Sequence, residues 1–136
     1  MKGKKQEKAR DGKRKVPKRP VVAAILLFLF MQPAMAVDPP YQKEMERLLM
    51  VMGNLYFLQP LCGFKQEDWR QNATELIDLD EPGQDRKQRL NGAFNEGYMA
   101  YSRLYRSCTQ SGKLAMARLM AEADHLARDI HSRYAE

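Results

Sequence analysis

The sequence has few of the residues that bind transition metals. It contains two histidines and two cysteines among 136 residues. His125 and His131 are six positions apart, about 240° around a helix, so they are poorly placed to share an ion. Met50 and Met52 point in nearly opposite directions on a helix. Glu122 and His125 form a Glu-x-x-His motif without the second copy that a di-iron bundle needs. We therefore expect no metal site and no cofactor.

Motifs for covalent catalysis are also missing. Ser102, Ser107 and Ser111 lack the glycine-rich turn that exposes a nucleophile. Cys62 and Cys108 are too far apart in sequence for the C-x-x-C motif of redox-active pairs. We therefore predict that the protein is not an enzyme.

Long apolar runs are scarce, and the clearest one lies near the N-terminus. The eleven residues from Val21 to Met31 are all apolar, which is short of the about 20 residues that span a bilayer. Ten Lys or Arg and two Asp or Glu precede this run, and a small-x-small motif follows at residues 34–36. We predict that residues 1–36 are a signal peptide of the Sec route, cleaved after Ala36. An uncleaved membrane anchor is the alternative.

Removal of this leader reverses the net charge. The full chain has 23 basic and 17 acidic residues, but residues 37–136 keep only thirteen basic and fifteen acidic ones. A nucleic-acid-binding protein normally carries a basic surface. We therefore expect no nucleic-acid partner, and contact with a membrane only through the signal segment during export.

Both cysteines lie in the exported part. An even number of cysteines in a small exported domain favours a disulfide, and two cysteines allow a single intramolecular pairing. A bond between Cys62 and Cys108 closes a loop of 47 residues. Such a crosslink contributes about 4 kcal/mol of stability in the chain-entropy treatment.

Apolar residues recur with the period of an α-helix through most of the exported part. The pattern predicts helices at about residues 41–59, 67–78, 84–109 and 113–134, with a break at residues 110–112. Alternation with period two is absent over any useful length. We predict an all-α fold, a small bundle of about four antiparallel helices in a single domain at residues 37–136, stapled by the disulfide.

The first predicted helix is apolar nearly all round between Leu48 and Leu58. Such a helix is either central in its own domain or half-covered by another chain. On the third and fourth predicted helices we expect one inward-facing stripe each. These stripes comprise Leu90, Phe94, Gly97, Tyr101, Leu104, Tyr105 and Cys108, then Met116, Leu119, Met120, Ala123, Leu126, Ile130 and Tyr134.

The third predicted helix holds the densest cluster of unusual residues. Gly97 lies on its inward stripe, where a neighbouring helix can approach closely. Gly92 lies off that stripe, although glycine inside a helix costs about 1 kcal/mol relative to alanine. One interpretation is a contact surface where a partner's backbone comes close. That surface comprises Asn91, Gly92, Asn95, Glu96 and Ser102. The other interpretation is that Gly92 packs against the loop near Cys62 or against the second helix.

Several segments of the exported part carry a resemblance. They are GNLYFL at 53–58, LCG at 61–63, WR at 69–70, RLNGAFNEGY at 89–98, CT at 108–109 and DIHSRY at 129–134. In these segments, and across residues 48–134, the chain resembles an uncharacterised alphaproteobacterial family of short, signal-peptide-bearing periplasmic proteins with two cysteines. The resemblance implies a Gram-negative source and a periplasmic location, and it supplies no catalytic or binding residues.

These features together predict a non-enzymatic periplasmic protein of the cell envelope. We expect it to bind another envelope protein, or a second copy of itself, through the apolar first helix and the glycine-bearing face of the third. The alternative is a periplasmic helical module that binds a small ligand or a metal in the bundle core.

Overall fold

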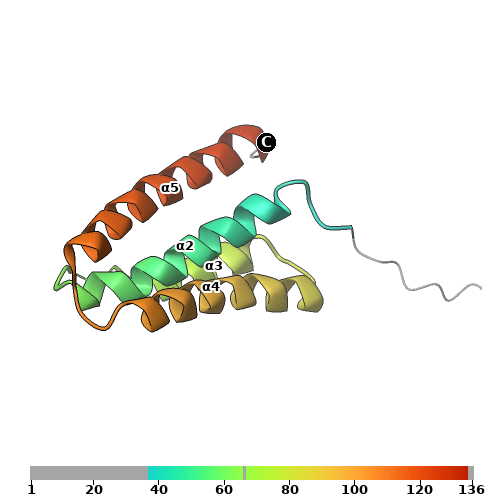
Figure 1. Cartoon of the computed structure of the whole chain (residues 1–136). Coiled ribbons are helices and arrows are strands. Elements are labelled where there is room, and N and C mark those ends of the chain that lie inside the picture. The colour runs from blue at the N-terminus through green and yellow to red at the C-terminus, as the bar shows by residue number, and fades with distance from the viewer. Residues whose placement is uncertain (1–36, 66, 135–136) are drawn as a thin grey trace, which may run out of the picture. The chain divides into compact units, whose positions relative to one another are not determined.

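The computed structural model describes residues 37–65 and 67–134. These residues form four helices, which are α2 (Gln42–Leu61), α3 (Trp69–Leu79), α4 (Gln84–Leu104) and α5 (Gln110–Tyr134) (Figure 1). No strand occurs in these two ranges, so the predicted all-α fold is confirmed. The predicted signal peptide and its cleavage after Ala36 lie outside the described residues. In the described part, no helix is both long enough and apolar enough to cross a bilayer.

The helices alternate in direction. α2 and α4 run the same way, and α3 and α5 run the opposite way (Figure 1). α2 is the central element, because α3, α4 and α5 each pack against it. α3 also contacts α4, whereas α5 packs on α2 alone among the described helices.

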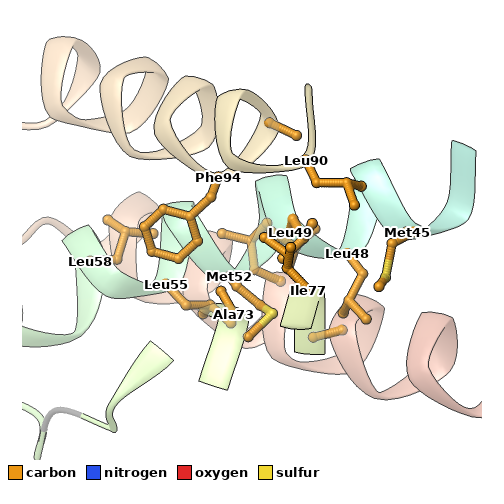
Figure 2. Packing of buried hydrophobic residues seen from close by; sticks show 14 of the residues in the cluster. Met45, Leu48, Leu49, Met52, Leu55, Leu58, Ala73, Ile77, Leu90 and Phe94 are labelled. Atoms are coloured by element: carbon orange, nitrogen blue, oxygen red, sulfur yellow. The ribbon is translucent and has the colours of Figure 1, made fainter. Parts of the chain in front are cut away.

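The all-round apolar character of α2 follows from this central place. Leu49, Val51, Leu55 and Leu58 point in different directions around the helix and are each fully buried. Figure 2 shows side chains of α2 packed against Leu90 and Phe94 of α4 and against buried side chains of the other helices. Of the two interpretations left open by the sequence, the described fold supports the one in which α2 is central in its own domain.

Two glycines allow α2 and α4 to approach closely. A Cβ atom added to Gly97 of α4 would lie 2.0 Å from the carbonyl oxygen of Met50, and one added to Gly53 of α2 would lie 2.0 Å from that of Phe94. Both distances are far below van der Waals contact. The inward place predicted for Gly97 is therefore confirmed, and Gly53 is its reciprocal partner on the facing helix.

The disulfide fastens the end of this helix pair. Cys62 follows the last residue of α2, and Cys108 lies in the loop between α4 and α5. Their Cα atoms are 4.8 Å apart and the sulfurs are bonded. Because α2 and α4 are parallel, their C-terminal ends lie at the same pole, as the predicted pairing requires.

The boundary between α4 and α5 differs from the prediction. α4 ends at Leu104, where Tyr105 adopts an extended conformation, and α5 begins at Gln110. The hydroxyl of Thr109 accepts a hydrogen bond from the N–H of Gly112 at 3.1 Å. Thr109 thus acts at the start of α5 as a capping residue does. The segment predicted as a break, residues 110–112, is instead the first turn of a helix.

Three smaller expectations are also wrong. Leu104 is 72% exposed and Met120 is 37% exposed, so neither belongs to the core. Cys108 lies in a loop rather than on a helical stripe. α2 continues past its predicted end at residue 59, through Pro60 to Leu61. The N–H that Pro60 lacks affects only the last turn of the helix.

Candidate functional site

A groove lies between α3 and α5, and its first hollow is near the start of α2. This hollow has a volume of about 460 Å³. Its lining is mostly apolar, with Asp80, His131 and two tyrosines as polar groups. The lining residues are Tyr41, Met45, Leu48, Leu76, Leu79, Asp80, Ala127, Ile130, His131 and Tyr134. We call it the first hollow.

A second hollow lies along the same edge of α5, near its start. Its volume is about 500 Å³. It is lined by Gln59, Phe64, Lys65, Glu67, Lys113, Met116, Ala117 and Met120. Met116, Met120, Ala127 and Tyr134 fall on one edge of the α5 helix by its period, so the two hollows lie along the same edge of α5. We call the whole feature the α3/α5 groove.

Large apolar side chains are exposed along this groove. Leu79 of α3 is 83% exposed, Phe64 of the preceding loop is 50% exposed, and Met120 of α5 is 37% exposed. Two of them line the second hollow and Leu79 lines the first. A group of exposed apolar side chains beside a hollow indicates a binding surface more strongly than isolated ones do.

The groove is open because α3 and α5 are not joined. In the described ranges no contact between backbones, hydrogen bond or ion pair links these two helices. On the flank between α3 and α4, by contrast, the Arg70 guanidinium lies 5.1 Å from the Tyr56 ring centre and 4.9 Å from that of Phe94. Lys87 of α4 also pairs with Asp78 of α3 at 2.7 Å.

In the described ranges α4 and α5 are likewise joined by no contact between backbones, hydrogen bond or ion pair, and the side chains that reach α5 on this flank come from α2 and from Tyr105. Nε of Arg47 donates a hydrogen bond to Oε1 of Glu122 at 2.5 Å, joining α2 to α5. Tyr101 and Tyr105 stack with ring centres 5.7 Å apart on this flank. Burial raises the pKa of Tyr101.

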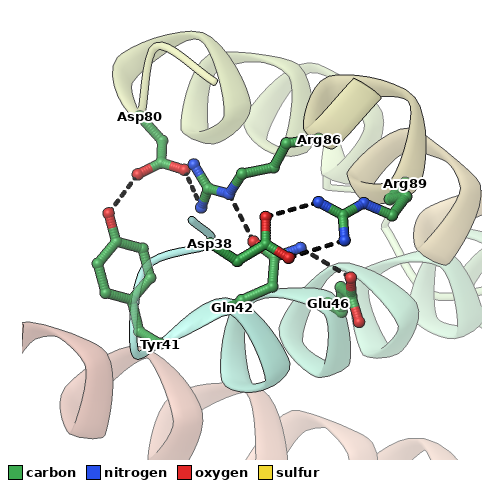
Figure 3. Close-up of polar contacts among 7 residues, drawn as sticks. All are labelled: Asp38, Tyr41, Gln42, Glu46, Asp80, Arg86 and Arg89. Carbon is green, nitrogen blue, oxygen red and sulfur yellow. Dashed lines mark hydrogen bonds and ion pairs between the residues drawn. The ribbon is translucent and has the colours of Figure 1, made fainter. Parts of the chain in front are cut away.

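A polar network forms one end of the groove (Figure 3). The Tyr41 hydroxyl donates to Oδ1 of Asp80 at 2.6 Å, and Asp80 also pairs with Arg86. Nε of Arg86 donates to the side chain of the buried Gln42. The hydrogen bond to Asp80 raises the pKa of Tyr41. The network fixes the start of α2 against the turn between α3 and α4.

A second ion pair extends this end of the molecule. Arg89 of α4 donates two hydrogen bonds to the carboxylate of Asp38, at 2.8 and 2.6 Å. The bonds from Arg89 hold the pKa of Asp38 below its usual value. The chain before α2 is thereby tied to α4.

The other end of the groove is fixed by one buried amide. Oε1 of Gln59 accepts hydrogen bonds from Nε1 of Trp69 at 2.7 Å and from the backbone N–H of Glu67 at 3.2 Å. Gln59 is 6% exposed. It therefore sets where α3 begins relative to α2.

The binding residues proposed from sequence lie elsewhere. Asn91, Gly92, Asn95 and Glu96 are exposed and Ser102 is partly exposed on the outward side of α4. No atom lies within 4 Å of a Cβ built on Gly92. The interpretation that Gly92 packs against the Cys62 loop or α3 is therefore wrong. The five residues share one helix, yet none of them lines either hollow.

The described residues offer little to a metal ion. No group of three or more His, Cys, Asp and Glu side chains is arranged to hold one in the described part of the chain. Nδ1 of His125 lies 3.7 Å from Asp129, one turn along the exposed side of α5. His131 lines the first hollow among apolar residues.

Sequence reasoning missed the groove. The second predicted helix ended before Leu79, and Met120 was assigned to the core. A signal was present at Leu79, which lies on the same helix edge as the charged Asp68 and Glu75. Its apolar side chain there is unusual for a solvated edge.

Comparison with known proteins gives a family without an assigned activity. No curated protein and no solved structure matches the chain. Residues 40–134 match DUF2385, a family described as proteins of unknown function. This stretch includes all four described helices and both cysteines. The chain therefore belongs to the DUF2385 family.

Proposed function

We propose that the chain is an exported, non-enzymatic protein of the periplasm that binds another protein of the cell envelope. The observation that carries the proposal is the open, apolar α3/α5 groove. Exposed apolar surface of this kind is normally covered in use by a partner or a ligand. The apolar surface of α2, which motivated the same idea from sequence, is occupied within the chain itself.

Export is supported by two features of different kinds. The basic and apolar leader ending in a small-x-small motif is typical of a signal peptide. The bond between Cys62 and Cys108 suits an oxidising compartment, because cytosolic thiols are kept reduced.

Fractionation of cells that produce the full chain tests the export step. We expect the periplasmic extract to contain a protein that begins at Val37 and has no thiol open to alkylation. Recovery of intact Met1, or of two alkylatable thiols on periplasmic material, would contradict the proposal.

Crosslinking in the same cells tests the binding step. We expect defined crosslinked species that contain this chain and a second envelope protein. A version with the leader removed, which stays in the cytoplasm, is the control for contacts unrelated to export. A chain that remains uncrosslinked in the periplasm contradicts the binding step.

A small-ligand module is the second candidate. Each hollow has a volume within the range of about 300–1,000 Å³ that ligand sites occupy. Native mass spectrometry of periplasmic protein tests this, since a retained ligand adds mass to the intact chain. Elemental analysis of the same sample tests a bound metal.

A further inference from the structure

The end of the bundle that holds the disulfide carries positive charge. It comprises residues 62–65, which follow α2, and residues 103–114, which run from the end of α4 into the start of α5. We call this surface the basic end. Its two stretches contain four basic residues and no acidic one, and all four are exposed, namely Lys65, Arg103, Arg106 and Lys113. The acidic residues that follow most closely are Glu67 and Asp68, before α3.

Two observations place these stretches side by side. The bond between Cys62 and Cys108 joins them, with the Cα atoms 4.8 Å apart. Lys65 of the first stretch and Lys113 of the second both line the second hollow. In Figure 1 the loop between α4 and α5 accordingly lies at the end of α2. The four positive charges therefore act from one end of the molecule.

Large apolar side chains project from the same end. Leu104 is 72% exposed and Phe64 is 50% exposed. The N–H of Phe64 donates to the carbonyl of Gln59 at 3.0 Å. The N–H of Gly63 donates to the carbonyl of Pro60 at 3.1 Å, which completes a Schellman motif. The residue in the place of Phe64 commonly packs back on the helix in this motif. Here the backbone of the turn is fixed and the ring is half exposed.

The charges of the basic end are not balanced by ion pairs. Within residues 37–65 and 67–134, none of its four basic residues lies in an ion pair. At the opposite end, by contrast, Arg86, Lys87 and Arg89 each pair with a carboxylate. The basic end therefore presents a net positive field to whatever it meets.

The opposite end is a poor complement for this surface in a second copy of the chain. Its aspartates are each already in an ion pair, so much of their charge is balanced within the chain. They are Asp38, Asp78, Asp80, Asp85, Asp124 and Asp129. The surface of an anionic membrane fits both features of the basic end, because its phosphates attract basic side chains and its acyl chains accept apolar ones.

We infer that the basic end binds the surface of a membrane that contains anionic phospholipid. The four basic side chains contact the phosphate groups, and Phe64 and Leu104 enter the boundary between headgroups and acyl chains. The first hollow, near the start of α2, stays away from the lipid. The net charge of residues 37–136 led to the expectation of no such contact, because it averages the basic end with an acidic remainder. The inference goes beyond the proposed function and does not depend on a protein partner.

Sedimentation with lipid vesicles tests the inference on the purified, disulfide-bonded protein that begins at Val37. We expect binding to vesicles of phosphatidylglycerol and phosphatidylcholine, and none to phosphatidylcholine alone. Arg103→Gln with Arg106→Gln should weaken binding about 25-fold, since each basic residue near an anionic surface strengthens it about fivefold. Lys43→Gln with Arg128→Gln removes the same charge from exposed positions toward the other end and should change binding less than about twofold.

The apolar contribution is measured separately. Phe64→Ser with Leu104→Ser should weaken binding about tenfold and leave its dependence on salt in place. The paired arginine variant should instead bind with a smaller dependence on salt. Circular dichroism checks that each variant is folded.

Three results with vesicles would overturn the inference. They are equal binding to both lipid compositions, equal losses in the two charge variants, and no binding to either composition. Full competition by millimolar glycerol phosphate would also overturn it, because a soluble headgroup does not replace the contacts with acyl chains.

Photocrosslinking in cells tests the same surface in the full chain. One chain carries p-benzoylphenylalanine in place of Leu104, and a matched chain carries it in place of Asn95, which is also exposed on α4. We expect lipid adducts in the mass spectrum of the first chain and not of the second. Crosslinks from position 104 only to another protein, or only to a second copy, would overturn the membrane assignment and leave the proposed function untouched. The absence of any adduct at position 104 would also overturn it.

Discussion

α4 and α5 cover opposite sides of the same helix by different means. α4 meets α2 through two reciprocal glycine contacts and is tied to the segment before α2 by Arg89 and Asp38. α5 meets α2 through an apolar stripe, a ring contact between Tyr41 and Tyr134, and one partly exposed ion pair. The α2/α4 interface tolerates almost no change in the distance between its helices, whereas the α2/α5 interface tolerates some. α5, which lines both hollows of the α3/α5 groove, is therefore held less rigidly against α2 than α4 is.

The largest expected effect comes from the disulfide at the C-terminal ends of α2 and α4. Replacing both Cys62 and Cys108 with alanine should lower the free energy of unfolding by about 4 kcal/mol, because the open chain gains entropy when it unfolds. Urea denaturation measures the change. Reduction of the unmodified protein should produce the same loss, and reduction of the double variant should produce none. A loss below about 1 kcal/mol would indicate that the glycine interface alone holds this end.

The glycine interface should show the next largest effect. Gly97→Ala places a methyl group against the backbone of Met50, so the helices must separate, and we expect a loss of about 3 kcal/mol in unfolding free energy. Gly92→Ala is the matched control on the same helix. Its site is open, so the change should stabilise the protein by up to about 1 kcal/mol through helix propensity. Equal effects of the two changes would refute the close-contact argument.

These two interfaces also show what sequence could and could not predict. Helical periodicity located all four helices, and the inward place of Gly97 followed from its position on the stripe. The partner of Gly97 could not be predicted, because the register of α2 against α4 depends on tertiary packing. The helix boundary at Thr109 was missed because its hydroxyl caps α5, a local interaction that the apolar period does not record.

The groove was harder to predict for a related reason. Its opening depends on which flanks are bridged by side chains from separate helices, such as Arg70 on the α3/α4 flank. A one-dimensional pattern gives the inward face of each helix but not the pairs of helices that stay apart. The binding role predicted for the polar residues on α4 stays a prediction.

The polar network at the rim should contribute a smaller, pH-dependent amount. Tyr41→Phe removes the hydrogen bond to Asp80 and should cost about 1 kcal/mol at neutral pH. The pKa of Tyr41 is raised in the folded state, so this contribution is complete below the ordinary tyrosine pKa of about 10. It should disappear as the pH rises through the folded-state pKa. Urea titrations of both proteins across the alkaline range measure it. A difference that persists at high pH would contradict the assignment.

The ion pair on the α5 side should contribute least. Glu122→Gln leaves Arg47 exposed to water, and we expect a loss of about 0.5 kcal/mol that salt reduces further. Hydrogen exchange measures where the loss falls. The amides of α5 should exchange faster in the variant, while those of α4 keep their protection, because α5 packs on α2 alone among the described helices. Equal acceleration in both helices would mean that α5 opens only when the whole bundle does, and α5 would then be held as rigidly as α4.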